Sequence, residues 1–396
     1  MKVPYGKAVY NNDEIKAVIS VLKKNTQMNE KVSLFEHKIS KLFNHKYACM
    51  VNSGSSAIEL IADTLNLNQN DEIISPALTF STSLSPFLRR NINCTLIDVK
   101  PGFYTIDEDK IENSITKKTK AIVVPNLIGN LPNYKKIKNI CNKYKLFLIE
   151  DSADTINSTY DGLKSGSYSD FVISSFYGSH VITCAGTGGI VCTSNKDFYK
   201  KIIMKRSWGR RSSLFDYTNS EKIENRFDHK VSNIPYDGKF IFDDLGYNME
   251  PSEISAAFGI EQLKKLKKFT VMRNINFEKH LNFFQNYEDL FILPKKYKQT
   301  KNNWLAFPLT IKKNKFFDRK NIQIFFEKNG IQTRPIFTGN ISKQPGFKKI
   351  KFKINKFGLS HTNMIMKNGF MIGCHQGLSS SQINYTHKIF KKLLGR

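Results

Sequence analysis

The sequence predicts an α/β protein with a large, mostly parallel sheet and a smaller C-terminal α/β part. Two observations lead to this prediction. Short β-branched or aromatic runs alternate with stretches of helical periodicity through the first two-thirds of the chain, which is typical of a parallel sheet with helices on both faces. At 396 residues the chain is also too long for one ordinary core, and its apolar fraction of 40% is ample for a packed interior.

Seven segments have the length and composition of buried strands, so we expect a seven-stranded sheet. The last two are joined without room for a good helix, which indicates a functional turn between Ser175 and Gly188. The expected strands are YACMV (47–51), EIISP (72–76), CTLIDV (94–99), AIVVPN (121–126), LFLIED (146–151), FVISSF (171–176) and GGIVCTS (188–194).

Helices are expected where apolar residues recur at helical spacing, as they do over residues 32–43 and 58–65. Residues 205–250 are charged and weakly periodic, and we interpret them as a long irregular excursion. Such segments are usually functional or lie at an interface. Because helical periodicity resumes at about Pro251, we divide the chain into a large domain (1–250) and a small C-terminal domain (251–396).

The composition argues against several classes of function. The formal net charge is +27, but the lysines are spread over nearly the whole chain, so we expect no nucleic-acid binding. A basic surface would still attract a substrate that carries a diphosphate. No apolar run could span a bilayer, and the first residues lack the apolar region of a signal peptide. The six cysteines are scattered without a C-x-x-C pair, so we expect reduced thiols in a cytoplasmic protein.

Three segments place polar residues at expected strand ends. Residues 52–57 (NSGSSA) open a helix and suit a phosphate, although a plain N-cap turn has the same pattern. Asp151 ends its strand where open α/β sheets bind ligands, and it suits either a protonated ring nitrogen of a cofactor or the cap of the next helix. His180 follows two strand-end serines and precedes a glycine turn. A lone histidine is more often structural, but this setting indicates a site.

The order of these segments resembles the DegT/DnrJ/EryC1/StrS family of nucleotide-sugar aminotransferases, from about Pro4 to the C-terminus. Most members have lysine where this sequence has His180. That histidine, the preceding S-F-Y and the segment 333–345 (TRPIFTGNISKQP) resemble the 3-dehydratase branch, which makes 3,6-dideoxyhexoses. The segments that carry the wider resemblance are N-S-G-S-S, A-L-T-F, I-E-D-S-A-D, S-S-F-Y-G-S-H, G-T-G-G and L-G-Y-N.

The resemblance implies the type I PLP-enzyme fold, with PLP or PMP as cofactor, and normally a homodimer with active sites at the subunit interface. In such a site a glycine and two serines hold the cofactor phosphate, and a phenylalanine stacks on the pyridine ring. An aspartate pairs with the pyridine nitrogen, and an asparagine reaches the phosphate in the partner subunit's site. The matching residues here are Gly54, Ser55, Ser175, Phe80, Asp151 and Asn248.

Histidine in place of lysine changes the chemistry that the resemblance implies. A lysine amine links covalently to PLP, whereas an imidazole forms no stable imine but titrates near neutrality. This combination suits PMP chemistry on a nucleotide-linked 4-keto-6-deoxy sugar. His180 is expected to remove a proton from the methylene carbon of the cofactor so that the 3-hydroxyl leaves, while Asp151 keeps the pyridine protonated. An ordinary aminotransferase reaction is disfavoured.

Within the branch, one group carries a [2Fe–2S] cluster and works with a reductase. Because no cysteine lies between 193 and 373, we expect no iron–sulfur centre and no metal. The GDP-4-keto-6-deoxymannose 3-dehydratases instead use L-glutamate to regenerate PMP, and they match better. In this family the position of Thr187 usually carries an acidic residue, and a second histidine is common at the position of Val181. Both positions lie near the reacting centre. Asp154 stands where aminotransferases often have glutamine or histidine near the phenolic oxygen of the cofactor.

Three arginines are candidates for substrate binding. Arg334 suits either the glutamate carboxylate or the nucleotide diphosphate, or else a surface ion pair. Arg210 and Arg211 lie in the irregular excursion. They could bind the sugar nucleotide across a dimer interface, or they could simply be exposed to solvent. The alternatives to a 3-dehydratase are an enzyme of the same branch with another nucleotide sugar or a reductase partner, and a non-catalytic sugar-nucleotide-binding homologue.

Overall fold

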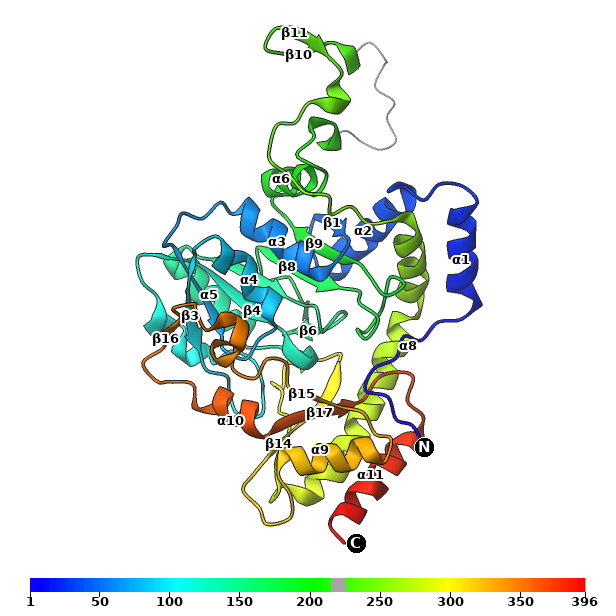
Figure 1. Ribbon diagram of the computed structural model, residues 1–396, viewed down its shortest axis with the longest axis vertical. Helices are drawn as coiled ribbons and strands as arrows, with labels where there is room; N and C mark the ends of the chain where they lie inside the picture. Colours follow the sequence, from blue (N-terminus) through cyan, green and yellow to red (C-terminus); the bar gives the residue numbers. More distant parts are fainter. Residues whose placement is uncertain (215–225, 396) are drawn as a thin grey trace.

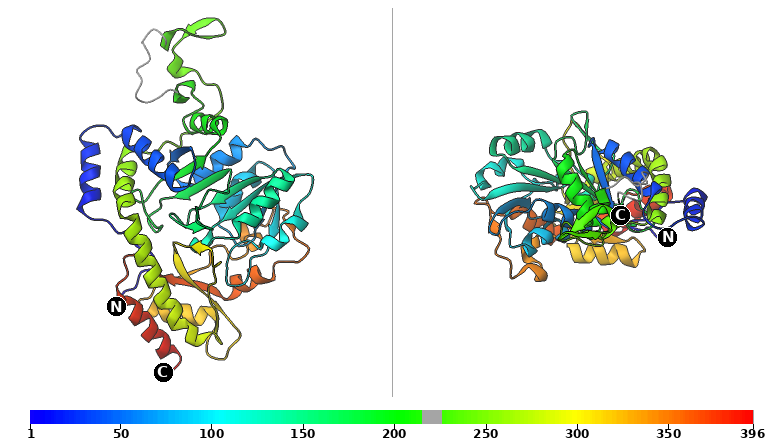
Figure 2. Two further views of the ribbon diagram at one scale, coloured as in Figure 1. Left: turned by 180° about the vertical axis from the view of Figure 1, so that it is seen from behind. Right: turned by 90° about the horizontal axis from the view of Figure 1, so that it is seen from above.

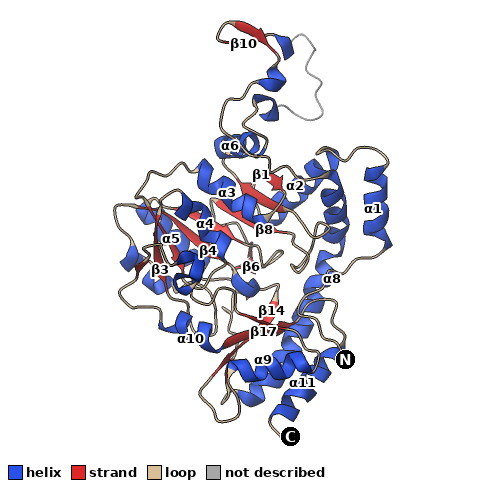
Figure 3. Ribbon diagram, viewed as in Figure 1, coloured by secondary structure: helices blue, strands red, loops and turns tan. Residues whose placement is uncertain are grey.

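The computed structural model describes residues 1–214 and 226–395, and its larger part is a sheet of eight strands with helices on both faces (Figures 1 and 3). Strand β9 runs antiparallel to β1 and β8 on either side of it, and all the other pairs of neighbouring strands in this sheet are parallel. The seven expected strands are all present. Their order, with the edge strand β16, is β1 (Tyr47–Val51), β9 (Gly189–Thr193), β8 (Phe171–Ser175), β5 (Phe147–Asp151), β4 (Thr119–Pro125), β2 (Glu72–Pro76), β3 (Asn93–Ile97) and β16 (Lys353–Ile354).

Both faces of the sheet are covered, which explains why its strands are nearly continuous apolar runs. Residues of β2 are buried without alternation, as expected for a strand between two helical layers. Helices α3 (Gly54–Thr64), α4 (Ser81–Arg89) and α6 (Lys196–Arg206) share one apolar cluster with the strands. The opposite face packs against α2 (Glu30–Leu42), α5 (Tyr134–Tyr144) and the first turns of α8 (Glu253–Phe284).

The smaller part is built on an antiparallel sheet and the second half of α8 (Figure 2). Phe277 and Phe284 of α8 pack into a core rich in phenylalanine. Its strands are β12 (Phe291–Ile292), β14 (Ala306–Ile311), β17 (Gly369–Gly373) and β15 (Thr333–Pro335), and its helices are α9 (Arg319–Lys328), α10 (Ser360–Asn368) and α11 (Ser380–Leu393). A further small sheet joins β13 (Thr300–Lys301), β6 (Thr159–Tyr160) and β7 (Leu163–Lys164).

The chain passes between the two parts more than once. Val3 forms a bridge with Ile331 in the smaller part, whereas the two residues of β16 pair with β3 in the large sheet. Helix α1 (Asn12–Leu22) packs on α8, which runs through both parts (Figure 1). The division at residue 250 therefore stays a prediction.

The expected excursion begins where α6 ends, and Figure 1 shows it projecting away from the sheet. Its described residues include two short 3₁₀ helices (Arg211–Leu214 and Gly238–Phe240) and a hairpin of β10 (His229–Val231) and β11 (Ile234–Tyr236), and the sequence did not predict the hairpin. The hairpin turns at Ser232 and Asn233, which both have positive φ, as a two-residue hairpin turn requires. Within the described ranges, no helix has the length and apolar character needed to cross a membrane.

Glu253 joins α8 to α2 through a buried carboxylate. It accepts the backbone N–H groups of Asn29 at 2.6 Å, Lys31 at 2.8 Å and Val32 at 2.9 Å. These are the groups at the beginning of α2 that have no partner within the helix, and the positive end of the helix dipole favours a negative charge there. One side chain thus fixes the angle between two long helices.

We expect Glu253→Ala to lower the free energy of unfolding by about 2–4 kcal/mol, because one buried and two partly buried N–H groups lose their acceptor. Urea denaturation followed by circular dichroism measures this change. Glu261→Ala, on the same helix, removes an ion pair with the largely exposed Lys264 and should cost less than about 1 kcal/mol. Equal losses for the two variants would contradict the capping role of Glu253.

Candidate active site

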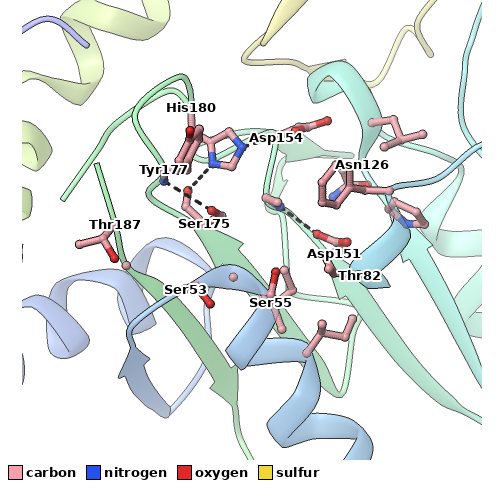
Figure 4. A pocket seen from close by; sticks show the side chains of 18 of the residues that line it. Ser53, Ser55, Thr82, Asn126, Asp151, Asp154, Ser175, Tyr177, His180 and Thr187 are labelled. Atoms are coloured by element: carbon pink, nitrogen blue, oxygen red, sulfur yellow. Dashed lines mark hydrogen bonds and ion pairs between the residues drawn. The ribbon is translucent and has the colours of Figure 1, made fainter. Parts of the chain in front are cut away.

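A cavity of about 480 Å³ opens at the carboxyl ends of β4, β5 and β8 (Figure 4). This is the edge at which parallel α/β sheets bind ligands. The first turn of α3 closes one side, and the loop 176–188 between β8 and β9 closes another. This loop is the turn that the sequence predicted to be functional.

The beginning of α3 forms a corner suited to a phosphate. Ser53 caps the helix by accepting the N–H of Ser56 at 3.1 Å, and the first-turn N–H groups of Gly54 and Ser55 have no carbonyl partner within the helix. A Cβ on Gly54 would lie 2.8 Å from the Cβ of Ser175. The glycine therefore lets the helix begin directly beside the serine at the end of β8, with free N–H groups and hydroxyls at one point.

Asp151 ends β5 and is turned toward the cavity (Figure 4). Its carboxylate accepts the hydroxyl of Ser83 at 2.6 Å and the N–H of Ala153 at 3.1 Å. Burial raises the pKa of this carboxyl, the two hydrogen bonds oppose the rise, and the neighbouring charge of Glu150 adds to it. A protonated ring nitrogen would supply the positive charge that this buried carboxylate lacks.

His180 lies in the loop after β8, and its side chain is 17% exposed. Its Nδ1 lies 3.0 Å from the carbonyl oxygen of Ser175, which can only accept, so we assign the proton to Nδ1 and the lone pair to Nε2. Burial lowers the pKa of the imidazole to about 4; the charge of Arg273 lowers it too, and the Ser175 hydrogen bond opposes both. The resting side chain is therefore a neutral base at neutral pH.

Nε2 of His180 lies 4.0 Å from Oδ1 of Asp154. The other carboxylate oxygen, Oδ2, accepts the N–H of Ile128 at 2.9 Å. Burial raises the pKa of Asp154 to about 7, the Ile128 hydrogen bond opposes this rise, and the charge of Asp151 adds to it. Two buried carboxyl groups and one imidazole thus line the same cavity.

The loop that carries His180 is held by the smaller part of the molecule. Arg273 of α8 donates to the carbonyl of His180 at 3.3 Å, and Gln376 donates to that of Val181 at 3.3 Å. Arg273 also donates to Gln376 at 2.6 Å, so the two side chains act as one clamp. Thr187, at the far end of the loop, donates to the carbonyl of Asn52 at 2.7 Å.

The structure brings together most of the residues that the sequence proposed for cofactor binding and catalysis. Phe80 lines the same cavity and is 51% exposed, which leaves its ring available for stacking. Sequence reasoning missed several lining residues; of these, Asn126 could have been found because it is the last residue of an expected strand. The proposed residues in the cavity wall are Gly54, Ser55, Phe80, Asp151, Ser175 and His180. The missed ones include Thr82, Asn126, Tyr177 and Phe337.

The other proposed residues lie outside this cavity. Asn248 forms a β-bridge with Ser207 at the base of the excursion. Arg210 has its guanidinium 4.3 Å from the ring of Trp208, and Arg211 pairs with Asp243 at 2.7 Å. Their roles at a partner's site stay predictions.

Arg334 lines a second hollow of about 790 Å³ beside the first. The two share Phe80, Tyr177 and Phe337 in their walls. The guanidinium of Arg334 lies 5.5 Å from the ring of Tyr5. The second hollow therefore offers a positive charge and aromatic faces within reach of the first.

Comparison with known proteins agrees with this geometry. Residues 9–391 match the family described as the DegT/DnrJ/EryC1/StrS aminotransferase family. The chain is 31% identical to the lipopolysaccharide biosynthesis protein RfbH of Salmonella typhimurium, with 91% of this chain and 84% of that protein aligned. It is 30% identical to the GDP-4-keto-6-deoxy-D-mannose 3-dehydratase of Escherichia coli O55:H7, with 98% of this chain and 99% of that protein aligned.

Solved structures of GDP-4-keto-6-deoxymannose-3-dehydratase also match almost the whole chain. One, with a trapped PLP-glutamate geminal diamine, has a TM-score of 0.89 at 29% identity and covers 98% of this chain and all of that one. Another, of a variant with histidine replaced by asparagine, contains GDP-perosamine; it has a TM-score of 0.87 at 29% identity and the same coverage. The fold is that of PLP-dependent aminotransferases, as the sequence predicted.

We expect Gly54→Ala to weaken PLP binding at least about tenfold, because the new methyl group must displace Ser175 from the beginning of α3. Titration of the purified protein with PLP, followed by absorbance, measures the dissociation constant. Gly346→Ala is the matched control, since a Cβ there meets no atom within 4 Å. Unchanged PLP affinity in Gly54→Ala would contradict the phosphate site at α3.

Proposed function

This chain belongs to the DegT/DnrJ/EryC1/StrS aminotransferase family, and on that premise we propose that it is a PLP/PMP-dependent 3-dehydratase of a nucleotide-linked 4-keto-6-deoxyhexose. The product would serve the synthesis of a 3,6-dideoxysugar or a related surface polysaccharide. The observation that carries the proposal is His180, a neutral base at the wall of the cavity where most relatives have lysine.

The composition of the cavity wall supports this proposal. None of the described residues that line it is a lysine, so nothing in that wall offers an amine for a covalent link to PLP. The cofactor would be held by the beginning of α3, by Phe80 and by Asp151, all of which remain. When bound, PLP or PMP supplies a conjugated ring that takes up electrons from a carbon attached to it.

Each residue of the site has a distinct task in this proposal. Asp151 holds a proton at the ring nitrogen, since a buried carboxylate stabilises the protonated form. His180 takes a proton at Nε2, while its Nδ1–H stays on the carbonyl of Ser175 and fixes the ring. The clamp of Arg273 and Gln376 keeps the loop, and with it the imidazole, in place.

The two hollows together suit a nucleotide sugar and an amino donor. The first holds the reacting centre, and Arg334 in the second offers a planar fork for the diphosphate or for the carboxylate of L-glutamate. The trapped glutamate adduct and the bound GDP-perosamine in the related structures support both classes of ligand. All six cysteines are buried and unpaired, and the expectation of no iron–sulfur centre stays a prediction.

We further propose a homodimer in which the excursion meets the partner subunit. Large apolar side chains of this segment are exposed, among them Ile234 at 63% and Leu245 at 89%. Exposed apolar groups gathered on one projecting segment are typical of an interface. Asn248 lies at its base and would reach the partner's phosphate site. Sedimentation equilibrium tests this proposal, and a monomer at micromolar concentration would contradict it.

The proposed reaction is tested by incubating the protein with PLP, L-glutamate and GDP-4-keto-6-deoxymannose. Loss of the 3-oxygen by mass spectrometry, with release of ammonia, would support the proposal. Conversion of PLP to PMP without deoxygenation would retain the PMP chemistry and direct the test to CDP- and dTDP-linked sugars. Failure to bind either form of the cofactor would contradict the proposal.

His180→Asn should lower kcat for deoxygenation by about 10²–10⁴-fold, because the amide cannot accept the proton. The dissociation constant for PMP should change less than about threefold, since the cofactor contacts at α3, Phe80 and Asp151 remain. Stopped-flow absorbance with preloaded PMP separates the two quantities. His37→Asn, at an exposed histidine, is the control. Undiminished deoxygenation in His180→Asn would exclude it as the base.

A further inference from the structure

The turn at Ile128 has a strained backbone conformation, and in this conformation it binds the carboxylate of Asp154. Ile128 has φ 62°, a left-handed conformation that costs a β-branched residue about 1–3 kcal/mol. In this conformation its N–H points at Oδ2 of Asp154 at 2.9 Å, and its carbonyl accepts the N–H of Leu305 at 2.8 Å. The strain thus secures one oxygen of a buried carboxylate.

The second oxygen of that carboxylate is left for His180. Among the described residues no hydrogen bond is made to Oδ1 of Asp154, and Nε2 of His180 lies 4.0 Å from it. Since Nδ1 is committed to the carbonyl of Ser175, Nε2 is the nitrogen at which a proton can be gained. A new N–H there would be directed to the free carboxylate oxygen, after a closure of about 1 Å to hydrogen-bond distance.

We propose that Asp154 is the positioning residue of His180: its ionised carboxylate accepts the Nε2–H that His180 acquires when it takes up a proton. The proton that leaves carbon forms the Nε2–H bond, and the imidazolium then has both N–H groups bound, one to Ser175 and one to Asp154. When the proton passes on to the departing hydroxyl, the pair returns to its starting state. This inference rests on the proposed function only for its kinetic consequence.

The pair has a pH dependence that other charged groups modulate. Asp151 from β5 adds negative charge beside Asp154, and Arg273 from α8 adds positive charge beside His180. Tyr5, in the N-terminal segment, lies near Asp154 and Arg273, with Cys374 and Arg334 also close, and burial raises the pKa of its hydroxyl so that it stays protonated. The pKa of Asp154, raised to about 7, and that of His180, lowered to about 4, mean that the pair binds one proton between these pH values.

The sign of the kinetic effect follows from this protonation. Below about pH 7 the proton on Asp154 blocks Nε2 as a base, and above it the carboxylate is free to stabilise the imidazolium. The rate of deoxygenation should therefore rise as the pH increases through about 7. Asp154→Asn should remove this rise and lower kcat at least about tenfold, with KM changed less than about threefold.

The direct test is a nuclear magnetic resonance titration of the imidazole nitrogens in the full-length protein, with and without PMP. The signal of His180 is identified by its loss in His180→Asn. In the unchanged protein we expect this signal to show a step near pH 7, because the proton shared with Asp154 perturbs Nε2. In Asp154→Asn that step should disappear, which leaves a transition more than about one pH unit lower.

Two further variants make the result decisive. Asp154→Glu keeps a carboxyl group and should retain the step, whereas Asp289→Asn, at an exposed site, should leave it unchanged. Identical titrations of His180 in the unchanged protein and in Asp154→Asn, both folded by circular dichroism, would overturn the proposal. Coupled titration without any deoxygenation would support the pair and contradict the proposed function. Deoxygenation by a protein in which His180 titrates independently of Asp154 would support the proposed function and contradict the pair.

Discussion

The site depends on one close approach, where the beginning of α3 meets the ends of β8 and β9. A Cβ on Gly54 would lie 2.8 Å from Ser175, and one on Gly189 would lie 2.2 Å from the backbone of Ser53. Because no side chain fits at either point, the free N–H groups of the helix and the strand-end serine meet at one corner. The same contact fixes where β8 ends and therefore where the loop that carries His180 begins. This contact places the anion corner next to the start of that loop, and the clamp of Arg273 and Gln376 then holds the loop and its imidazole.

The second determinant is the distribution of charge among the buried side chains of the cavity. Asp151 and Asp154 lie in the same cavity wall, and burial raises the pKa of each, so neither is stabilised by a nearby cation in the described chain. The guanidinium of Arg273 is close, but it donates its hydrogen bonds to carbonyl groups and to Gln376. The cavity therefore favours positive charge at two points, the ring nitrogen opposite Asp151 and the imidazole opposite Asp154. Both are points at which PMP chemistry needs a proton.

Much of this could be predicted from the sequence, and what was missed has physical reasons. The strands of the large sheet are apolar runs of four to seven residues, so composition located them. The two residues of β16 have no such signal, because their position follows from pairing with β3 across about 260 residues of chain. Asp151, Ser175 and His180 could be proposed because the first two lie at strand ends and the third lies shortly after one. The clamp of Arg273 and Gln376 could not, since it joins a helix and a loop that only the tertiary structure brings to residue 180.

The clamp and the loop that it holds lie outside the large sheet. Proteins with this fold include aminotransferases of about 20% identity, which retain the architecture and not necessarily the chemistry. The large sheet supplies the anion corner and the ring partner, which serve any PLP reaction. The proposed base, His180, lies on a loop whose carbonyl groups are held by α8 and by the segment after β17. A change of the base from lysine to histidine needs no change in the sheet, but it needs an acceptor for the proton that histidine gains. In this chain the strained turn at Ile128 holds Asp154 where it can be that acceptor.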